Sequence, residues 1–93
     1  MTANVLLVED DKPIAENVIL ALERDGFTCT HVLLGGACLD LVRASPVDLV
    51  ILDVGLPDMN GFEVCKGLRA MSDVPVIFLT ARSDEVDRVV GLE

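Results

Sequence analysis

The sequence predicts an α/β protein in which a doubly wound parallel sheet carries helices on both faces. Short, continuous apolar runs are typical of strands that are buried on both faces. Segments with apolar residues at helical spacing separate these runs, so the expected order is βαβαβαβα, and this alternation implies a parallel sheet. The 93 residues allow one domain. A hydrophobic content of 52% is sufficient for a core.

Four segments are expected to form the strands. Three are continuous apolar runs, and they span Val5–Val8, Leu49–Leu52 and Val76–Leu79. The fourth, Phe27–Val32, is less apolar and places Thr28 and Thr30 on one face, which favours a position nearer the edge of the sheet.

Four helices are expected between and after these strands. The first three span Pro13–Arg24, Gly36–Arg43 and Gly61–Met71, each with an apolar stripe. The fourth is expected to begin after Ser83 as N-cap. It places Asp84 and Glu85 in the first turn, where the helix dipole favours anions, and its apolar stripe continues to Val90.

Composition and charge exclude several classes of function. The net charge is −9, so this segment is not expected to contact nucleic acid directly, since that requires clustered cations. No apolar run is long enough to span a membrane, and no secretory signal is expected. The three cysteines, Cys29, Cys38 and Cys65, lack metal-ligand spacing and are interpreted as buried small hydrophobes in a reducing cytoplasm.

Acidic and hydroxyl side chains follow three of the predicted strands at their ends. Glu9 and Asp10 follow the first run, Asp53 the third and Thr80 the fourth. Because parallel strands end at one edge, where open α/β sheets bind ligands, these groups are expected to converge. Two like charges ~4 Å apart repel by about 4 kcal/mol at an effective dielectric of about 20. The cluster therefore requires a proton or a cation.

Mg²⁺ is the predicted cation, since it accepts a few hard oxygen ligands and keeps several of its waters. Gly55 follows Asp53 closely, in a turn-rich loop, and can add a backbone carbonyl. A metal held there would neutralise an incoming phosphoryl group. Asp53 could then act as the nucleophile and accept this group as an acyl phosphate.

Three stretches of the sequence, "VLLVEDD", "DLVILDVGLPDMNGFEVC" and "VPVIFLTARSDEVDRVVGLE", resemble the receiver domain of two-component response regulators. The resemblance covers the whole chain, and it is greatest to OmpR/PhoB-type transcriptional regulators, the CreB branch among them. It implies a flavodoxin-like (CheY-like) sheet with strand order 2-1-3-4. The family's fifth strand and fifth helix, and its effector domain, are expected to be missing, so residues 1–93 form a receiver domain that is incomplete at its C-terminus.

The resemblance also implies a role for each candidate site residue. Asp53 accepts a phosphoryl group from a histidine kinase. Asp10 binds Mg²⁺ directly, Glu9 binds it through water, and the Gly55 carbonyl completes the metal site. Thr80 is the switch hydroxyl that turns toward the phosphoryl oxygens, and Ala81 is a small position that leaves room for them.

The implied function is that of a cytoplasmic signalling module, whose phosphorylated surface controls a DNA-binding effector domain. It is not an enzyme beyond self-catalysed phosphotransfer and autodephosphorylation. The family also uses a lysine that pairs with the phosphoryl group. No lysine here matches it, because Lys12 and Lys66 fall in the wrong elements.

Three alternative functions compete with this one. An interaction module that has lost phosphorylation is favoured by the missing lysine and disfavoured by the intact acidic residues. A Mg²⁺-dependent phosphohydrolase with an Asp nucleophile would need a second Asp where Gly55 stands. A dinucleotide-binding domain would need a G-x-G-x-x-G after the first strand, which is absent.

Other polar residues are interpreted as structural. Asp11 is expected to cap a helix, and His31 to lie within a strand. Arg82 and Arg88 are expected on a solvated, salt-bridged face. Without a fifth strand, Val76–Leu79 would be an exposed edge that pairs with a second copy or another partner, and residues 1–93 alone would not form a well-folded monomer. The fourth-helix face is the other expected partner surface.

Overall fold

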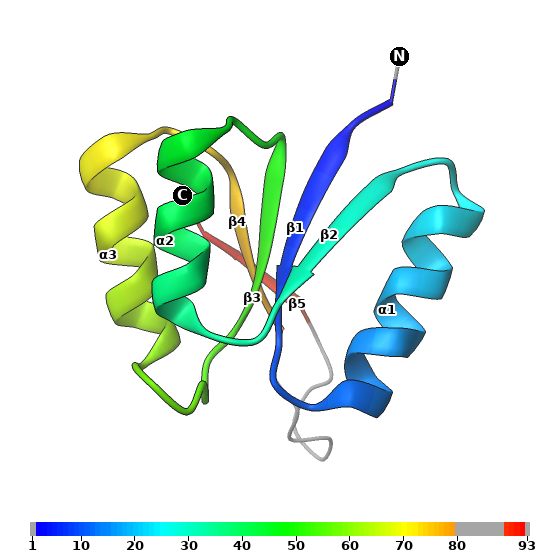
Figure 1. Cartoon of the computed structure of the whole chain (residues 1–93), viewed down its shortest axis with the longest axis horizontal. Helices are drawn as coiled ribbons and strands as arrows, with labels where there is room; N and C mark the ends of the chain where they lie inside the picture. The colour runs from blue at the N-terminus through cyan, green and yellow to red at the C-terminus, as the bar shows by residue number, and fades with distance from the viewer. Residues whose placement is uncertain (1, 80–88, 93) are drawn as a thin grey trace.

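The computed structural model describes residues 2–79 and 89–92, which form a sheet with helices on both sides (Figure 1). The elements, in chain order, are β1 (Asn4–Val8), α1 (Lys12–Arg24), β2 (Thr28–Val32), α2 (Gly35–Ala44), β3 (Leu49–Asp53), α3 (Gly61–Met71), β4 (Val76–Leu79) and β5 (Val89–Leu92). The first seven confirm the strands and helices that the sequence predicts up to Leu79.

The sheet has the order β2-β1-β3-β4-β5. The first four strands in this order are parallel, and β1 lies between β2 and β3. The doubly wound parallel sheet with strand order 2-1-3-4 is thereby confirmed. The less apolar strand β2 lies at one edge, as its exposed Thr28 and Thr30 predict.

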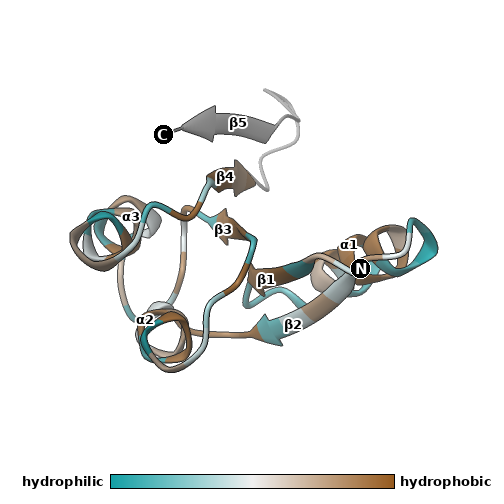
Figure 2. Cartoon of the chain, turned by 90° about the horizontal axis from the view of Figure 1, so that it is seen from above, coloured by the Kyte–Doolittle hydropathy of each residue, from teal (hydrophilic) through white to brown (hydrophobic). Residues whose placement is uncertain are grey.

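Alternate residues of the buried strands pack into two separate hydrophobic clusters, one on each face of the sheet. Leu6 and Val8 of β1 belong to a large cluster under α2 and α3, whereas Val5 and Leu7 belong to a smaller cluster under α1. Figure 2 shows α1 on one face of the sheet and α2 and α3 on the other. Burial on both faces explains why the strand sequences are continuously apolar.

The segment after β4 differs from the prediction. Residues 89–92, which the sequence predicts to lie in a fourth helix, form strand β5 and pair antiparallel with β4. The edge of β4 offers unpaired N–H and C=O groups, and the β-branched Val89 and Val90 favour an extended chain. The prediction that Val76–Leu79 is a bare edge is therefore wrong. The remainder of the predicted helix lies outside the described residues.

Side chains define the helix ends that the sequence predicts. Asp11 is the N-cap of α1, and its Oδ1 accepts a hydrogen bond from the Ile14 N–H at 3.1 Å, which confirms its structural role. Gly26 follows α1 with φ of 91°, a conformation that glycine adopts without strain. Asn60 caps α3 by accepting from the Phe62 N–H at 2.7 Å.

Among the residues described, no helix has the length and apolar character to cross a bilayer.

Candidate functional site

Glu9 is a carboxylate buried at the end of β1. Only 1% of its surface is exposed. Its Oε2 accepts a hydrogen bond from the Asp11 N–H at 3.0 Å, whereas its Oε1 is buried with no hydrogen-bond partner among the described residues. Because a buried unpaired oxygen is destabilising, Oε1 marks a position where a proton or a cation is required.

Asp10 and Asp53 complete an acidic cluster with Glu9. Each of the three residues offers one carboxylate oxygen, and these oxygens lie within 4.8 Å of one another. Asp53 ends β3 and is 6% exposed, whereas Asp10 is exposed to solvent. Strands β1 and β3 are neighbours in the sheet, so the predicted convergence of their carboxyl ends is confirmed. Thr80 and Ala81, the other predicted site residues, lie outside the described residues.

Burial and mutual repulsion raise the pKa values of two carboxyl groups in this acidic cluster, those of Glu9 and Asp53. The pKa of Glu9 is raised to about 7. Burial is the largest cause, the hydrogen bond from the Asp11 N–H opposes it, and the charges of Asp53 and Asp10 add to the rise. Burial also raises the pKa of Asp53; hydrogen bonding to the backbone of Gly55 and Val54 opposes this shift, and the charge of Asp10 adds to it. Both groups are therefore destabilised as carboxylates until a positive charge joins them.

A divalent cation fits this donor set. The unpaired Oε1 of Glu9 and the carboxylates of Asp10 and Asp53 provide hard oxygen ligands. Asp10 is exposed, which leaves one side of the cluster open to water or to an incoming group. These are the properties of a Mg²⁺ site that retains several waters.

The loop from Val54 to Asn60 follows Asp53, and backbone contacts join its two ends. Gly55 forms an isolated antiparallel bridge with Asn60, and the Gly61 N–H donates to the Val54 carbonyl at 2.8 Å. A Cβ at Gly61 would lie 2.5 Å from the Asp53 carbonyl oxygen, so no side chain fits there. The first turn of α3 therefore lies directly against the backbone of Asp53.

Two contacts near the site were not predicted from the sequence. His31 of β2 places its Nε2 2.8 Å from the Glu9 carbonyl oxygen, and Asp58 accepts hydrogen bonds from the first residues of α2. Both contacts join segments more than twenty residues apart, as their sequence separations of 22 and 23 show. The interpretation of His31 as a structural strand residue agrees with its contact to the backbone of Glu9.

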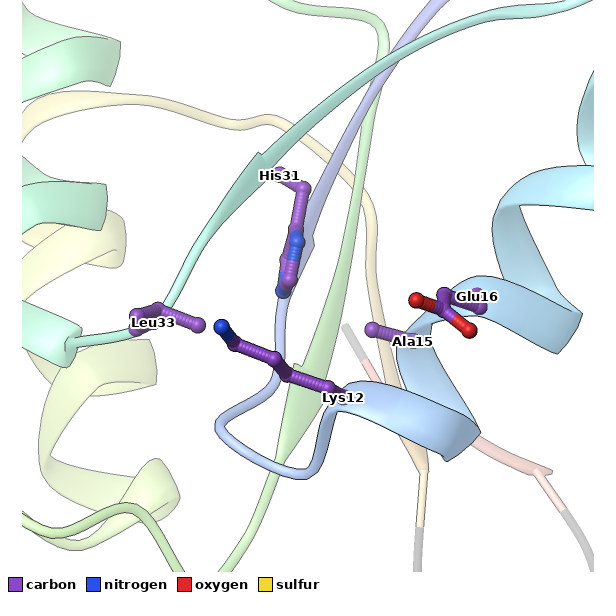
Figure 3. Close-up of a pocket in the computed structure, with 5 residues that line it drawn as sticks. All are labelled: Lys12, Ala15, Glu16, His31 and Leu33. Carbon is purple, nitrogen blue, oxygen red and sulfur yellow. The ribbon is translucent and has the colours of Figure 1, made fainter.

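A pocket of about 250 Å³ lies between α1 and the end of β2. Its lining residues are Lys12, Ala15, Glu16, His31 and Leu33. Figure 3 shows Lys12 and His31 extending into this space from α1 and β2. None of the three clustered carboxylates lines the pocket, so it is separate from the candidate cation site.

The pKa of Glu9 predicts how stability depends on pH in a chelator-treated sample. Its folded-state pKa of about 7 exceeds the usual value of 4.5, so between these pH values the folded chain holds a proton that the unfolded chain has released. We therefore expect the free energy of unfolding to fall as the pH rises from about 4.5 to about 7, by on the order of 3 kcal/mol. The raised pKa of Asp53 acts in the same direction.

Urea denaturation at about pH 5 and about pH 8, with excess chelator, measures this effect. In Glu9→Gln, a neutral side chain of the same size, the difference between the two pH values should shrink. An unchanged difference in Glu9→Gln would show that other groups cause it.

Comparisons with known proteins agree on one family. A family model described as the response regulator receiver domain matches residues 5–93. The transcriptional regulatory protein CreB of Escherichia coli K12 is 49% identical over 90 residues, which cover 96% of this chain and 39% of that protein. The DNA-binding response regulator MtrA of Mycolicibacterium smegmatis is 45% identical over 93 residues, covering 100% of this chain and 41% of MtrA. The chain thus spans about two fifths of the length of these relatives.

Solved structures show the same architecture. The response regulator protein TrrA of Thermotoga maritima, in complex with Mg²⁺-BeF, is 32% identical with a TM-score of 0.82, over 90% of this chain and 73% of that one. The non-phosphorylated receiver domain of HemR from Leptospira biflexa is 35% identical with a TM-score of 0.77, over 88% of this chain and 67% of that one.

Proposed function

The chain belongs to the response regulator receiver domain family, and from this premise we propose that it accepts a phosphoryl group on Asp53 from a sensor histidine kinase, with Mg²⁺ as cofactor. The reaction takes place in the cytoplasm and changes the surface that an effector domain contacts. The observation that carries this proposal is the acidic cluster, in which a buried Glu9 with an unpaired oxygen, an exposed Asp10 and a buried Asp53 meet within 4.8 Å.

The chemistry of the transfer follows from the position of Asp53. One of its carboxylate oxygens forms a bond to phosphorus, and the P–N bond of the donor phosphohistidine breaks. The electron pair of that bond stays on the imidazole, which takes up a proton, and Asp53 becomes an acyl phosphate. Bound Mg²⁺ supplies positive charge that neutralises the phosphoryl oxygens.

The residues around Asp53 have separate tasks in this proposal. Asp10 would hold the cation directly, Glu9 would hold it through water, and the Gly55 carbonyl would complete the set of ligands. Glu9 gives up its proton when the cation binds, so its pKa of about 7 makes binding weaker in acid. Thr80 and Ala81 are proposed to contact the phosphoryl group, as the switch hydroxyl and the small neighbouring position.

The output is proposed to be control of transcription. CreB is named a transcriptional regulatory protein and MtrA a DNA-binding response regulator, and both extend well beyond the part that this chain matches. The net charge of −9 is unsuited to a phosphate backbone, so DNA contact is assigned to an effector domain and not to this segment.

A small phosphodonor tests the proposed function directly. Incubation of the chain with acetyl phosphate and Mg²⁺ should add one phosphoryl group, visible by intact-mass spectrometry, and excess chelator should prevent the addition. The label should be lost in hydroxylamine, which cleaves acyl phosphates. A chain that binds Mg²⁺ but never acquires the group would instead support the alternative of an interaction module without phosphorylation.

A further inference from the structure

Asp58 is an exposed loop residue that forms two hydrogen bonds to a distant helix. Its Oδ1 accepts from the Gly35 N–H at 2.8 Å, and its Oδ2 accepts from the Gly36 N–H at 2.9 Å. These are the first two residues of α2, whose own N-cap residue, Leu34, makes no side-chain capping bond. Asp58 therefore supplies the cap of α2 from the loop that follows β3.

This helix cap combines two hydrogen bonds with a negative charge. Hydrogen bonds from the backbone of Gly36 and Gly35 lower the pKa of Asp58, so it is a carboxylate at neutral pH. A carboxylate that accepts two backbone N–H bonds at the positive end of a helix dipole forms charge-assisted bonds. The contact thus joins the loop to α2 more firmly than a neutral cap would.

The junction between α2 and this loop has little free space. A Cβ at Gly35 would lie 2.6 Å from Cγ2 of Val64 in α3 and 2.7 Å from the Met59 side chain. The N-terminal end of α2 therefore sits directly on the loop and on α3. Movement of the loop away from α2 would break both Asp58 bonds and this contact together.

The loop that Asp58 holds is also the loop that leads from Asp53 past Gly55. Its two ends are joined by the Gly55–Asn60 bridge and by the bond from the Gly61 N–H to the Val54 carbonyl. Between these ends, Asp58 joins the loop to α2 through its two bonds. Together these contacts restrict the positions that the loop, and Gly55 within it, can adopt next to Asp53.

We propose that Asp58 is a positioning residue, which latches the Val54–Asn60 loop to α2 and so preorganises the Gly55 carbonyl for the cation. This inference rests on the proposed function, since it takes the Mg²⁺ site from there. A loop that is already ordered loses less conformational entropy when the cation binds, and the affinity is correspondingly higher.

The test compares two changes at Asp58 with a matched control. Asp58→Ala removes both bonds, and Asp58→Asn retains one oxygen acceptor. The control is Asp48→Ala, because the exposed Asp48 also accepts a long-range backbone bond, from the Asn4 N–H at 2.7 Å, where β1 begins. Calorimetry gives the Kd for Mg²⁺, amide hydrogen exchange reports Gly35, Gly36 and Gly61, and thermal melting shows that each variant is folded.

We expect Asp58→Ala to weaken Mg²⁺ binding about five-fold, the factor that corresponds to loss of a typical helix cap. Asp58→Asn should lie between Asp58→Ala and the unaltered chain, and exchange at Gly35, Gly36 and Gly61 should be faster in Asp58→Ala. The control Asp48→Ala should change neither measurement. A folded Asp58→Ala that binds Mg²⁺ with unaltered affinity would overturn the inference and leave the proposed function standing.

Failure of the proposed metal site gives a different result. In that case the unaltered chain itself does not bind Mg²⁺. The rate of amide exchange at Gly61 is then the measurement that tests whether Asp58 holds the loop to α2. Faster exchange at Gly61 in Asp58→Ala supports the latch, because Gly61 lies at the far end of the loop. Unchanged exchange there overturns it.

Discussion

Replacing Asp53 by Asn should abolish the transfer of a phosphoryl group from acetyl phosphate, with a fall in rate of ~10³-fold or more. The reason is chemical, because an amide has the shape of the carboxylate but is not a nucleophile of this kind. Asp53 is buried and its pKa is raised, so a neutral side chain should be accommodated without strain. In excess chelator, Asp53→Asn should even raise the melting temperature, since it removes a buried charge that the charge of Asp10 repels.

The matched control is Asp73→Asn, the same chemical change at an exposed residue that lies between α3 and β4. This variant should be labelled at the rate of the unaltered chain. Mass spectrometry of the intact chains and of their peptides measures both the extent and the position of the label. Labelling of Asp53→Asn at the unaltered rate would contradict the assignment of Asp53 and would locate a different acceptor.

Replacing Asp10 by Ala should weaken Mg²⁺ binding by ~100-fold or more, because changes to even indirect metal partners cost 10- to 100-fold. Asp10 is exposed to solvent, so its loss should leave the fold unchanged. Titration with Mg²⁺, followed by amide chemical shifts around Asp53 and Gly55, measures the affinity. In the unaltered chain these shifts should saturate, and in Asp10→Ala they should not.

Asp11→Asn provides the control for this titration. It removes a charge next to Asp10 but keeps an oxygen that can cap α1. Its Mg²⁺ affinity should remain within about three-fold of the unaltered value, because a screened, exposed charge contributes little. Equal losses in Asp10→Ala and Asp11→Asn would show that net charge, and not ligation by Asp10, governs the affinity.

Much of this fold could be predicted because the helices and strands follow from patterns in the local sequence. The bounds of α3 and β4 were predicted to the residue from their apolar spacing and flanking turn residues. The acidic cluster was predicted because parallel strands must end at one edge, which places the end of β1 beside the end of β3.

The features that were not predicted depend on contacts between distant segments. Val89 and Val90 suit an apolar helical stripe and a strand equally, and the free edge of β4, which selects the strand, is not visible in their local sequence. Asp58 and His31 likewise reach partners 23 and 22 residues away, and no periodicity indicates such partners. The roles of Thr80 and Ala81 as contacts of the phosphoryl group remain predictions.

The position of β1 between β2 and β3 has a consequence for how the chain folds. Its two neighbours come from different distances along the chain, as the pairs Val5–Cys29 and Val5–Leu49 show, so the β1–β3 pair closes the longer loop and is expected to form later. Glu9 and Asp10 follow β1 and Asp53 ends β3, so a folding intermediate that contains only β1, α1 and β2 has no complete cation site. A cation that binds all three carboxylates therefore stabilises the native chain selectively, and partly folded forms lose population as its concentration rises.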